Sequence, residues 1–166
     1  MKSMKLIQGR GAPALADALL SAGHDEAGAS VTLLCWLMFG DLAKMMGKTR
    51  IVSHVWEFRL RGARADLVTF HEDSSITIFE IKGPSCAISD AASGIGQLFL
   101  YSALMPSALG YAPLKVELCL AAPCSNEEDA QTLHDTCRLA SVDYLRLPSS
   151  EVVRDIANKK LVEEAA

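Results

Sequence analysis

The sequence predicts one α/β domain in which a central mixed β-sheet is flanked by helices. Three consecutive strand-like runs are followed by a helix and a fourth strand, a pattern typical of a sheet with both antiparallel and parallel pairs. The chain has 166 residues, 50% hydrophobic and 22% charged, enough for one domain with its own core. Because no repeat, low-complexity tract or linker divides it, we expect a single domain over residues 1–166.

Two helices are expected before the sheet. Residues 13–22 predict a short helix, and residues 25–46 a longer one, because apolar side chains recur at helical spacing between Val31 and Leu42. Gly47 is expected to end the longer helix. Its methionine and leucine stripe favours a place in the core or in a dimer interface.

Three runs rich in β-branched and aromatic residues predict neighbouring strands. These strands cover residues 51–60, 64–70 and 76–82, with turns at 61–63 and 71–75. Pro84 ends the third run because proline lacks a backbone donor and restricts the residue before it.

Helices and strands alternate in the second half of the chain. Ser89 or Asp90 can cap a helix that runs to Leu104, ahead of Pro106. The spacing of Ser125 and Glu128 is that of a capping box. The further predicted elements are a strand at 114–121, a helix at 125–139, a strand at 142–145 and a helix at 150–160.

Composition excludes several classes of protein. The net charge of −4 excludes a polybasic coat, although residues 44–64 carry six basic residues and one acidic residue. The longest apolar run, residues 31–39, is half the ~18–20 residues that a membrane span needs. Five cysteines without framework spacing indicate reduced thiols, so we expect a cytoplasmic protein without a targeting segment. Neither a zinc site nor a nucleotide-phosphate loop is expected.

Two carboxylates are predicted to face each other between the second and third strands. With a symmetric turn, Phe70 opposes Ile76 and, further along, Asp66 opposes Glu80. Lys82 shares the face of Glu80, because strand side chains alternate. Like charges opposed within apolar strands are destabilising, so a compensating cation is expected. Mg²⁺ suits this role, since one or two carboxylates usually hold it together with water and phosphate oxygens.

Asp66 and the run Glu80-Ile81-Lys82 resemble the motif of the PD-(D/E)xK nuclease superfamily, which has the restriction-endonuclease-like fold. The predicted order αβββαβ between residues 25 and 121 resembles the core of that fold. Ala65 stands where the motif name has proline. In addition, Gln97 and Tyr101 resemble the Q-x-x-x-Y signature of one branch, and their spacing places them on one helical face.

The resemblance implies a nuclease that hydrolyses phosphodiester bonds in DNA with Mg²⁺, or Mn²⁺ as a substitute. It implies that Asp66, Glu80 and the carbonyl of Ile81 hold the metal and that Lys82 orients the attacking water. It further implies that Gln97 and Tyr101 orient Lys82 and contact the substrate backbone.

The family often has a further acidic residue, and two candidates stay open. Glu57 opposes Asp66 if the first hairpin has a two-residue loop, but faces the other way with a three-residue loop. Glu26, near the start of the long predicted helix, is the other candidate, and Glu57 is favoured.

The basic stretch adds a predicted track for nucleic acid at Arg59 and Arg61. The alternative hypothesis is a catalytically silent member of the same family that binds nucleic acid or a protein partner. The acidic segment 125–166 and the apolar helices would then support assembly, including a homodimer.

Overall fold

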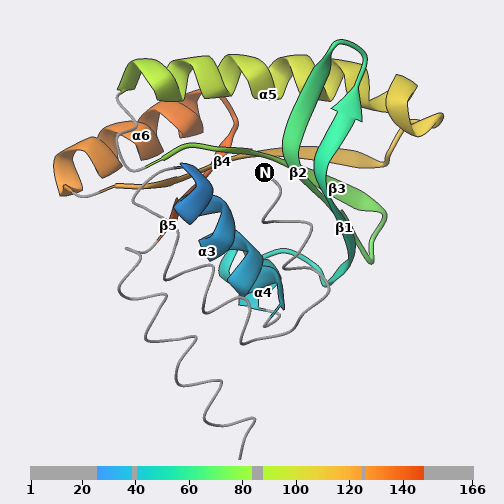
Figure 1. Ribbon diagram of the computed structural model, residues 1–166, viewed down its shortest axis with the longest axis horizontal. Coiled ribbons are helices and arrows are strands. Elements are labelled where there is room, and N and C mark those ends of the chain that lie inside the picture. Colours follow the sequence, from blue (N-terminus) through green and yellow to red (C-terminus); the bar gives the residue numbers. More distant parts are fainter. Residues whose placement is uncertain (1–25, 39–40, 84–87, 125, 148–166) are drawn as a thin grey trace, which may run out of the picture.

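The computed structural model describes residues 26–38, 41–83, 88–124 and 126–147. In this part of the chain a five-stranded sheet lies between helices on its two faces (Figure 1). The elements are α3 (Glu26–Met38), α4 (Asp41–Met45), β1 (Ile51–Leu60), β2 (Ala63–His71), β3 (Ser75–Ile81), α5 (Ile88–Leu109), β4 (Lys115–Pro123), α6 (Glu127–Leu139) and β5 (Asp143–Leu147). The predicted class, a mixed sheet flanked by helices, is confirmed.

The strands follow the order β1-β2-β3-β4-β5 across the sheet. The pairs β1–β2 and β2–β3 are antiparallel, whereas β3–β4 and β4–β5 are parallel. Antiparallel neighbours are joined by tight turns, while α5 and α6 supply the long crossovers that parallel neighbours require. The sheet is therefore mixed, as the run of strands predicts.

The alternation of side chains along β3 separates two apolar cores. Ile76 and Ile78 pack with Leu98 of α5 on one face of the sheet. Phe79 and Ile81 pack with residues of α3 and α4 on the opposite face. Figure 1 shows α5 and α6 on one side of the sheet and α3 and α4 on the other. Glu80 shares the face of Ile78 and so points toward α5.

Two predicted helix boundaries are wrong. Residues 25–46 contain two helices, α3 and α4, and the second begins at Asp41, a residue type that favours helix N-termini. Helix α5 continues past Pro106 to Leu109. Proline removes only one backbone donor there, and the fully buried Met105 keeps this last turn on the core. Gly110, at φ 74°, follows the end of the helix.

The cap of α6 lies one residue later than predicted. Asn126 is the N-cap, and its Oδ1 accepts a hydrogen bond of 2.7 Å from the backbone N–H of Asp129. Ser125 lies outside the described residues, as do the predicted helices at 13–22 and 150–160. Within the described part of the chain, no helix is long and apolar enough to cross a membrane.

Both predicted turns are shorter in the structure. The loop between β1 and β2 consists of Arg61 and Gly62, and Gly62 has a φ of 74°, which suits a two-residue hairpin. Strands β2 and β3 extend to His71 and Ser75. The hydroxyl and backbone N–H of Ser75 both donate to the Asp73 carboxylate, at 2.6 and 3.0 Å, which stabilises the turn.

Candidate active site

The predicted register between β2 and β3 is confirmed for the pairs that form the ladder. Phe70 opposes Ile76, and the register continues to Leu67 opposite Phe79. One position further along, Asp66 and Glu80 are the next residues of the two strands. The backbone pairing of β2 with β3 ends before this position, and the backbone N–H of Ile81 donates instead to Asp66 Oδ2 at 2.8 Å. Asp66 therefore lies against the peptide that joins Glu80 to Ile81.

Lys82 connects the end of β3 to helix α5. Its ammonium donates to Glu80 Oε1 at 2.6 Å and to Gln97 Oε1 at 3.1 Å. The side chains of Lys82 and Glu80 are only 18% and 5% exposed. The lysine charge is thus held in a poorly hydrated environment, beside the Glu80 carboxylate and the Gln97 amide oxygen.

Tyr101 completes this chain of contacts from inside the core. Gln97 Nε2 donates to the Tyr101 hydroxyl at 3.4 Å, one helical turn further along α5. The tyrosine is 4% exposed, so its ring belongs to the core on this face. Burial, together with the negative charges of Glu80 and Asp66 and a hydrogen bond to Glu80, raises the pKa of Tyr101 well above its usual range. The hydroxyl therefore stays protonated.

Gly94 is a site residue that the sequence analysis did not single out. A Cβ atom at this position would lie 2.9 Å from Leu120 Cδ1 and 3.1 Å from Lys82 Cε. The absence of a side chain lets α5 approach β3 and β4 closely enough for Gln97 to reach Lys82. In the sequence, the signal for this role is a glycine inside a predicted helix. Glycine destabilises a helix by ~0.5–1 kcal/mol relative to alanine, so its presence indicates a close approach of another element.

Glu57 lies on β1 opposite Asp66, because the hairpin loop has two residues and Trp56 and Phe58 pair with Leu67 and Ala65. Its φ of 51° is unusual for a residue other than glycine, and it interrupts the ladder there. The Glu57 carboxylate lies 3.7 Å from Arg64 Nη1. Glu26 is the first residue of α3, and its side chain lies outside the described residues. The additional acidic ligand stays a prediction.

Two oxygen donors of this site suit a hard divalent cation. Asp66 and Glu80 are neighbours in register beside the Ile81 peptide. Across the described ranges, no group of three or more His, Cys, Asp or Glu side chains is arranged to hold a metal. A set of two carboxylates matches Mg²⁺, which takes its remaining ligands from water and phosphate.

Five of the six basic residues of the stretch 44–64 divide into two kinds, and the sixth, Lys44, is exposed on α4. Lys48, Arg50 and Arg64 form ion pairs with acidic side chains. Arg59 and Arg61 are exposed near the tip of the β1–β2 hairpin. This tip lies at the end of the sheet where β2 begins and β3 ends, which is also the end that carries Asp66, Glu80 and Lys82.

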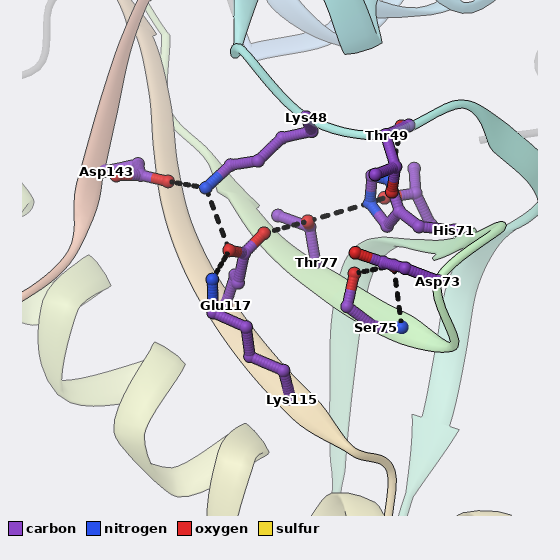
Figure 2. Close-up of polar contacts among 10 residues, drawn as sticks. Lys48, Thr49, His71, Asp73, Ser75, Thr77, Lys115, Glu117 and Asp143 are labelled. Carbon is purple, nitrogen blue, oxygen red and sulfur yellow. Dashed lines mark hydrogen bonds and ion pairs between the residues drawn. The ribbon is translucent and has the colours of Figure 1, made fainter.

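A second polar cluster lies on the opposite face of the sheet (Figure 2). Lys48 reaches from the segment after α4 to Glu117 on β4 and Asp143 on β5, at 3.0 Å in each case. Lys115 also pairs with Glu117 at 2.5 Å. Thr77 donates to Glu117 at 3.4 Å, and its hydroxyl oxygen lies 2.9 Å from His71 Nε2. These contacts connect β2, β3, β4 and β5 around a row of polar side chains.

Cys119 and Cys137 are buried, one in each of the two cores. Complete burial raises the pKa of Cys119, which disfavours the thiolate that binds metals.

Comparison of the chain with protein-family models, curated proteins and solved structures finds no match.

Proposed function

We propose that this chain is a metal-dependent nuclease that hydrolyses phosphodiester bonds in DNA. One observation carries the proposal. Asp66, Glu80 and Lys82 come together at one end of the sheet, and Gln97 of α5 contacts the lysine. Two carboxylates and an ammonium, largely shielded from water, are costly for a structural role and suited to a divalent cation and a phosphate.

The arrangement of the elements supports membership of the PD-(D/E)xK superfamily. Apart from the short helix α4, the succession α3, β1, β2, β3, α5 and β4 resembles the order αβββαβ expected for the family core. The residues that resemble the family motifs lie on β2, on and just after β3, and on α5. The motif residues and the element order are separate observations, and both support the proposal of a restriction-endonuclease-like fold.

Asp66, Glu80 and the carbonyl of Ile81 are the groups that would hold Mg²⁺. When bound, the metal supplies Lewis-acid polarisation of the scissile phosphate and lowers the pKa of water. Asp66 is oriented for this role by the N–H of Ile81, which fixes one carboxylate oxygen. Lys82 acts as a cation rather than as a base, because its partners Glu80 and Gln97 both accept hydrogen bonds from the ammonium.

Lys82 would therefore stabilise negative charge that develops on the phosphate and orient the attacking water. Gln97 and Tyr101 would position Lys82 for this role. Tyr101 holds the amide nitrogen of Gln97, so the amide oxygen faces the lysine. Arg59 and Arg61 would contact phosphates beside the site, at the hairpin tip, without reading sequence.

Cleavage assays on duplex, flapped, branched and single-stranded DNA with Mg²⁺ and Mn²⁺ test the proposal. We expect cleavage by the wild type and its loss in Lys82→Ala with the fold retained, because a cation that acts on the transition state contributes several kcal/mol there. Lys44→Ala, an exposed lysine on α4, is the control. Full activity of Lys82→Ala contradicts the mechanism. No cleavage of any substrate favours a catalytically silent binding module.

Metal binding has a separate test. Mg²⁺ or Mn²⁺ should raise the melting temperature of the wild type, because a ligand that binds only the folded state stabilises it by RT ln(1 + c/Kd), where c is the free ligand concentration. Asp66→Asn should abolish this shift, whereas Asp90→Asn, on the exposed first turn of α5, should retain it. An equal shift in Asp66→Asn would place the metal elsewhere.

A further inference from the structure

We propose that in the metal-free protein the Lys82 ammonium occupies the position beside Glu80 that a metal cation would take, and that Lys82 releases Glu80 but keeps its Gln97 contact when a metal is bound. This inference rests on the proposed metal site. It is carried by the contacts of the lysine: Nζ lies 2.6 Å from Glu80 Oε1 and 3.1 Å from Gln97 Oε1. The same carboxylate is the predicted metal ligand.

An ammonium and a divalent cation compete for one carboxylate. Two positive charges within ~4 Å of each other repel strongly where water is scarce. The Glu80 side chain is 5% exposed and that of Lys82 18%, so solvent screens this repulsion poorly. Glu80 therefore has to release Lys82, at least in part, to bind a metal. The lysine sets the metal affinity as well as the chemistry.

Gln97 provides the second anchor that such an exchange needs. Its amide oxygen is neutral, so it holds the ammonium without attracting a divalent ion as strongly as a carboxylate does. Tyr101 contacts the amide nitrogen at 3.4 Å, which favours the orientation with the oxygen toward Lys82. Because Gly94 has no side chain, the backbone of α5 packs closely against the aliphatic part of Lys82. A Cβ atom at Gly94 would lie only 3.1 Å from Lys82 Cε. Lys82 can thus release Glu80 and retain its contact with Gln97.

Calorimetric titration of the full chain with Mn²⁺ tests the exchange without any substrate. Lys82→Met keeps the apolar stem but removes the charge, so Mn²⁺ should bind about tenfold more tightly than to the wild type, equivalent to ~1.4 kcal/mol. Lys48→Met is the matched control. Its side chain is 19% exposed and also pairs with a poorly exposed glutamate, Glu117, which Lys115 still neutralises in the variant. The affinity of this control should equal that of the wild type.

The gain in Mn²⁺ affinity of Lys82→Met must depend on the predicted metal ligands. Adding Asp66→Asn to Lys82→Met should remove the tighter binding. Unchanged or weaker Mn²⁺ binding by folded Lys82→Met overturns the proposal, as does an equal gain in Lys48→Met.

A measurement on the unmodified chain keeps the test independent of any variant. The rate at which an amine-specific reagent labels Lys82, followed by mass spectrometry, should rise when Mg²⁺ is added, because the ammonium leaves Glu80. Lys48 serves as the internal reference, and its rate should stay constant. Protection of Lys82 by Mg²⁺, or an unchanged rate at saturating metal, contradicts the exchange.

These results separate the inference from the proposed function. A protein that binds Mn²⁺ with the expected dependence on Lys82 but cleaves no DNA supports the exchange and contradicts the nuclease proposal. A protein that cleaves DNA while Lys82→Met leaves Mn²⁺ affinity unchanged supports the nuclease and contradicts the exchange.

Discussion

At the scale of single residues, the candidate site consists of polar groups that are buried together with their partners. Glu80 is 3% exposed and Tyr101 4%, and each has a hydrogen-bonding partner in the site. Loss of one partner leaves the other in a poorly hydrated environment, which costs more than the hydrogen bond contributes. Substitutions here should therefore affect stability and catalysis together.

Tyr101→Phe should lower the free energy of unfolding by about 1 kcal/mol, because it removes a buried hydroxyl that contacts Gln97 and Glu80. Cleavage should also slow, since the Gln97 amide loses the contact that orients it. Tyr111→Phe is the control, because Tyr111 is 55% exposed and should tolerate the change within ~0.5 kcal/mol. Urea denaturation measures the free energy of unfolding of the two variants. Equal values for Tyr101→Phe and Tyr111→Phe would contradict the burial of the Tyr101 hydroxyl.

At the scale of elements, the docking of α5 determines whether the site is assembled. The helix contributes Leu98 and Met105 to the core and Gln97 and Tyr101 to the site. Its two glycines differ sharply: Gly94 is packed against β3 and β4, whereas a Cβ at Gly96 meets nothing within 4 Å. They form a matched pair on one helix.

Gly96→Ala should stabilise the protein by about 0.5–1 kcal/mol, the usual gain for alanine over glycine inside a helix. Gly94→Ala should gain less and should slow cleavage, because Leu120 and Lys82 must move away from the new methyl group. Thermal unfolding and cleavage rates of the two variants provide the measurement. The same gain in both, with full activity, would show that α5 has room at Gly94.

The polar cluster around Glu117 links strands in the same way on the opposite face. Burial favours the neutral acid, but hydrogen bonds and charges from Lys115 and Lys48 outweigh it and hold the pKa of Glu117 below its usual value of 4.5. A carboxylate with a lowered folded-state pKa stabilises the fold above its unfolded pKa. That stabilisation is lost as the pH falls through the folded pKa.

Glu117→Gln should therefore cost ~1.5–3 kcal/mol at pH 7, the range for a hydrogen bond to a charged group. The difference from the wild type should shrink as the pH falls below about 4.5, because the wild type then loses the same charge. Denaturant unfolding between pH 7 and pH 3 measures this. Glu128→Gln, on the exposed first turn of α6, should change stability by less than ~0.5 kcal/mol at either pH.

At the scale of the whole molecule, charge is unevenly distributed although the net charge is only −4. Several basic residues of the stretch 44–64 are committed to ion pairs, which leaves the tip of the β1–β2 hairpin as the positively charged feature next to the site. A local basic feature beside acidic ligands can guide a polyanion toward a metal site without coating the protein in positive charge.

Replacing Arg59 and Arg61 together by alanine should weaken DNA binding and flatten its salt dependence. Each lost phosphate contact removes about 0.9 from the log–log slope on duplex DNA, so the double variant should lose ~1.8. The control is Arg50→Ala with Arg146→Ala, which changes the net charge equally but removes arginines paired with Glu72 and Glu127. Fluorescence anisotropy at several salt concentrations measures the slopes. Equal slopes for the two double variants would place the DNA track elsewhere.

The local features of this protein follow from its amino-acid sequence. Strand β1 has the predicted bounds, and the register of β2 and β3 follows from a turn that is symmetric about Asp73. The register is unaffected by the shorter turn, because both strands extend equally. Alternation along β3 then assigns Glu80 to the side opposite Phe79. Such features depend on neighbours along the chain and on the two-residue period of a strand.

Contacts between groups far apart in the sequence depend on how the helices and strands pack together. The contact between Lys82 and Gln97 requires α5 to lie close to the sheet at Gly94, and the partners of Lys48 come from two strands far along the chain. The left-handed conformation of Glu57 is likewise invisible in the sequence, because glutamate has no local preference for it. Helix α5 retains Pro106 because burial of its last turn outweighs the loss of one backbone hydrogen bond. In each case the deciding free energy comes from packing between elements, which local sequence patterns do not encode.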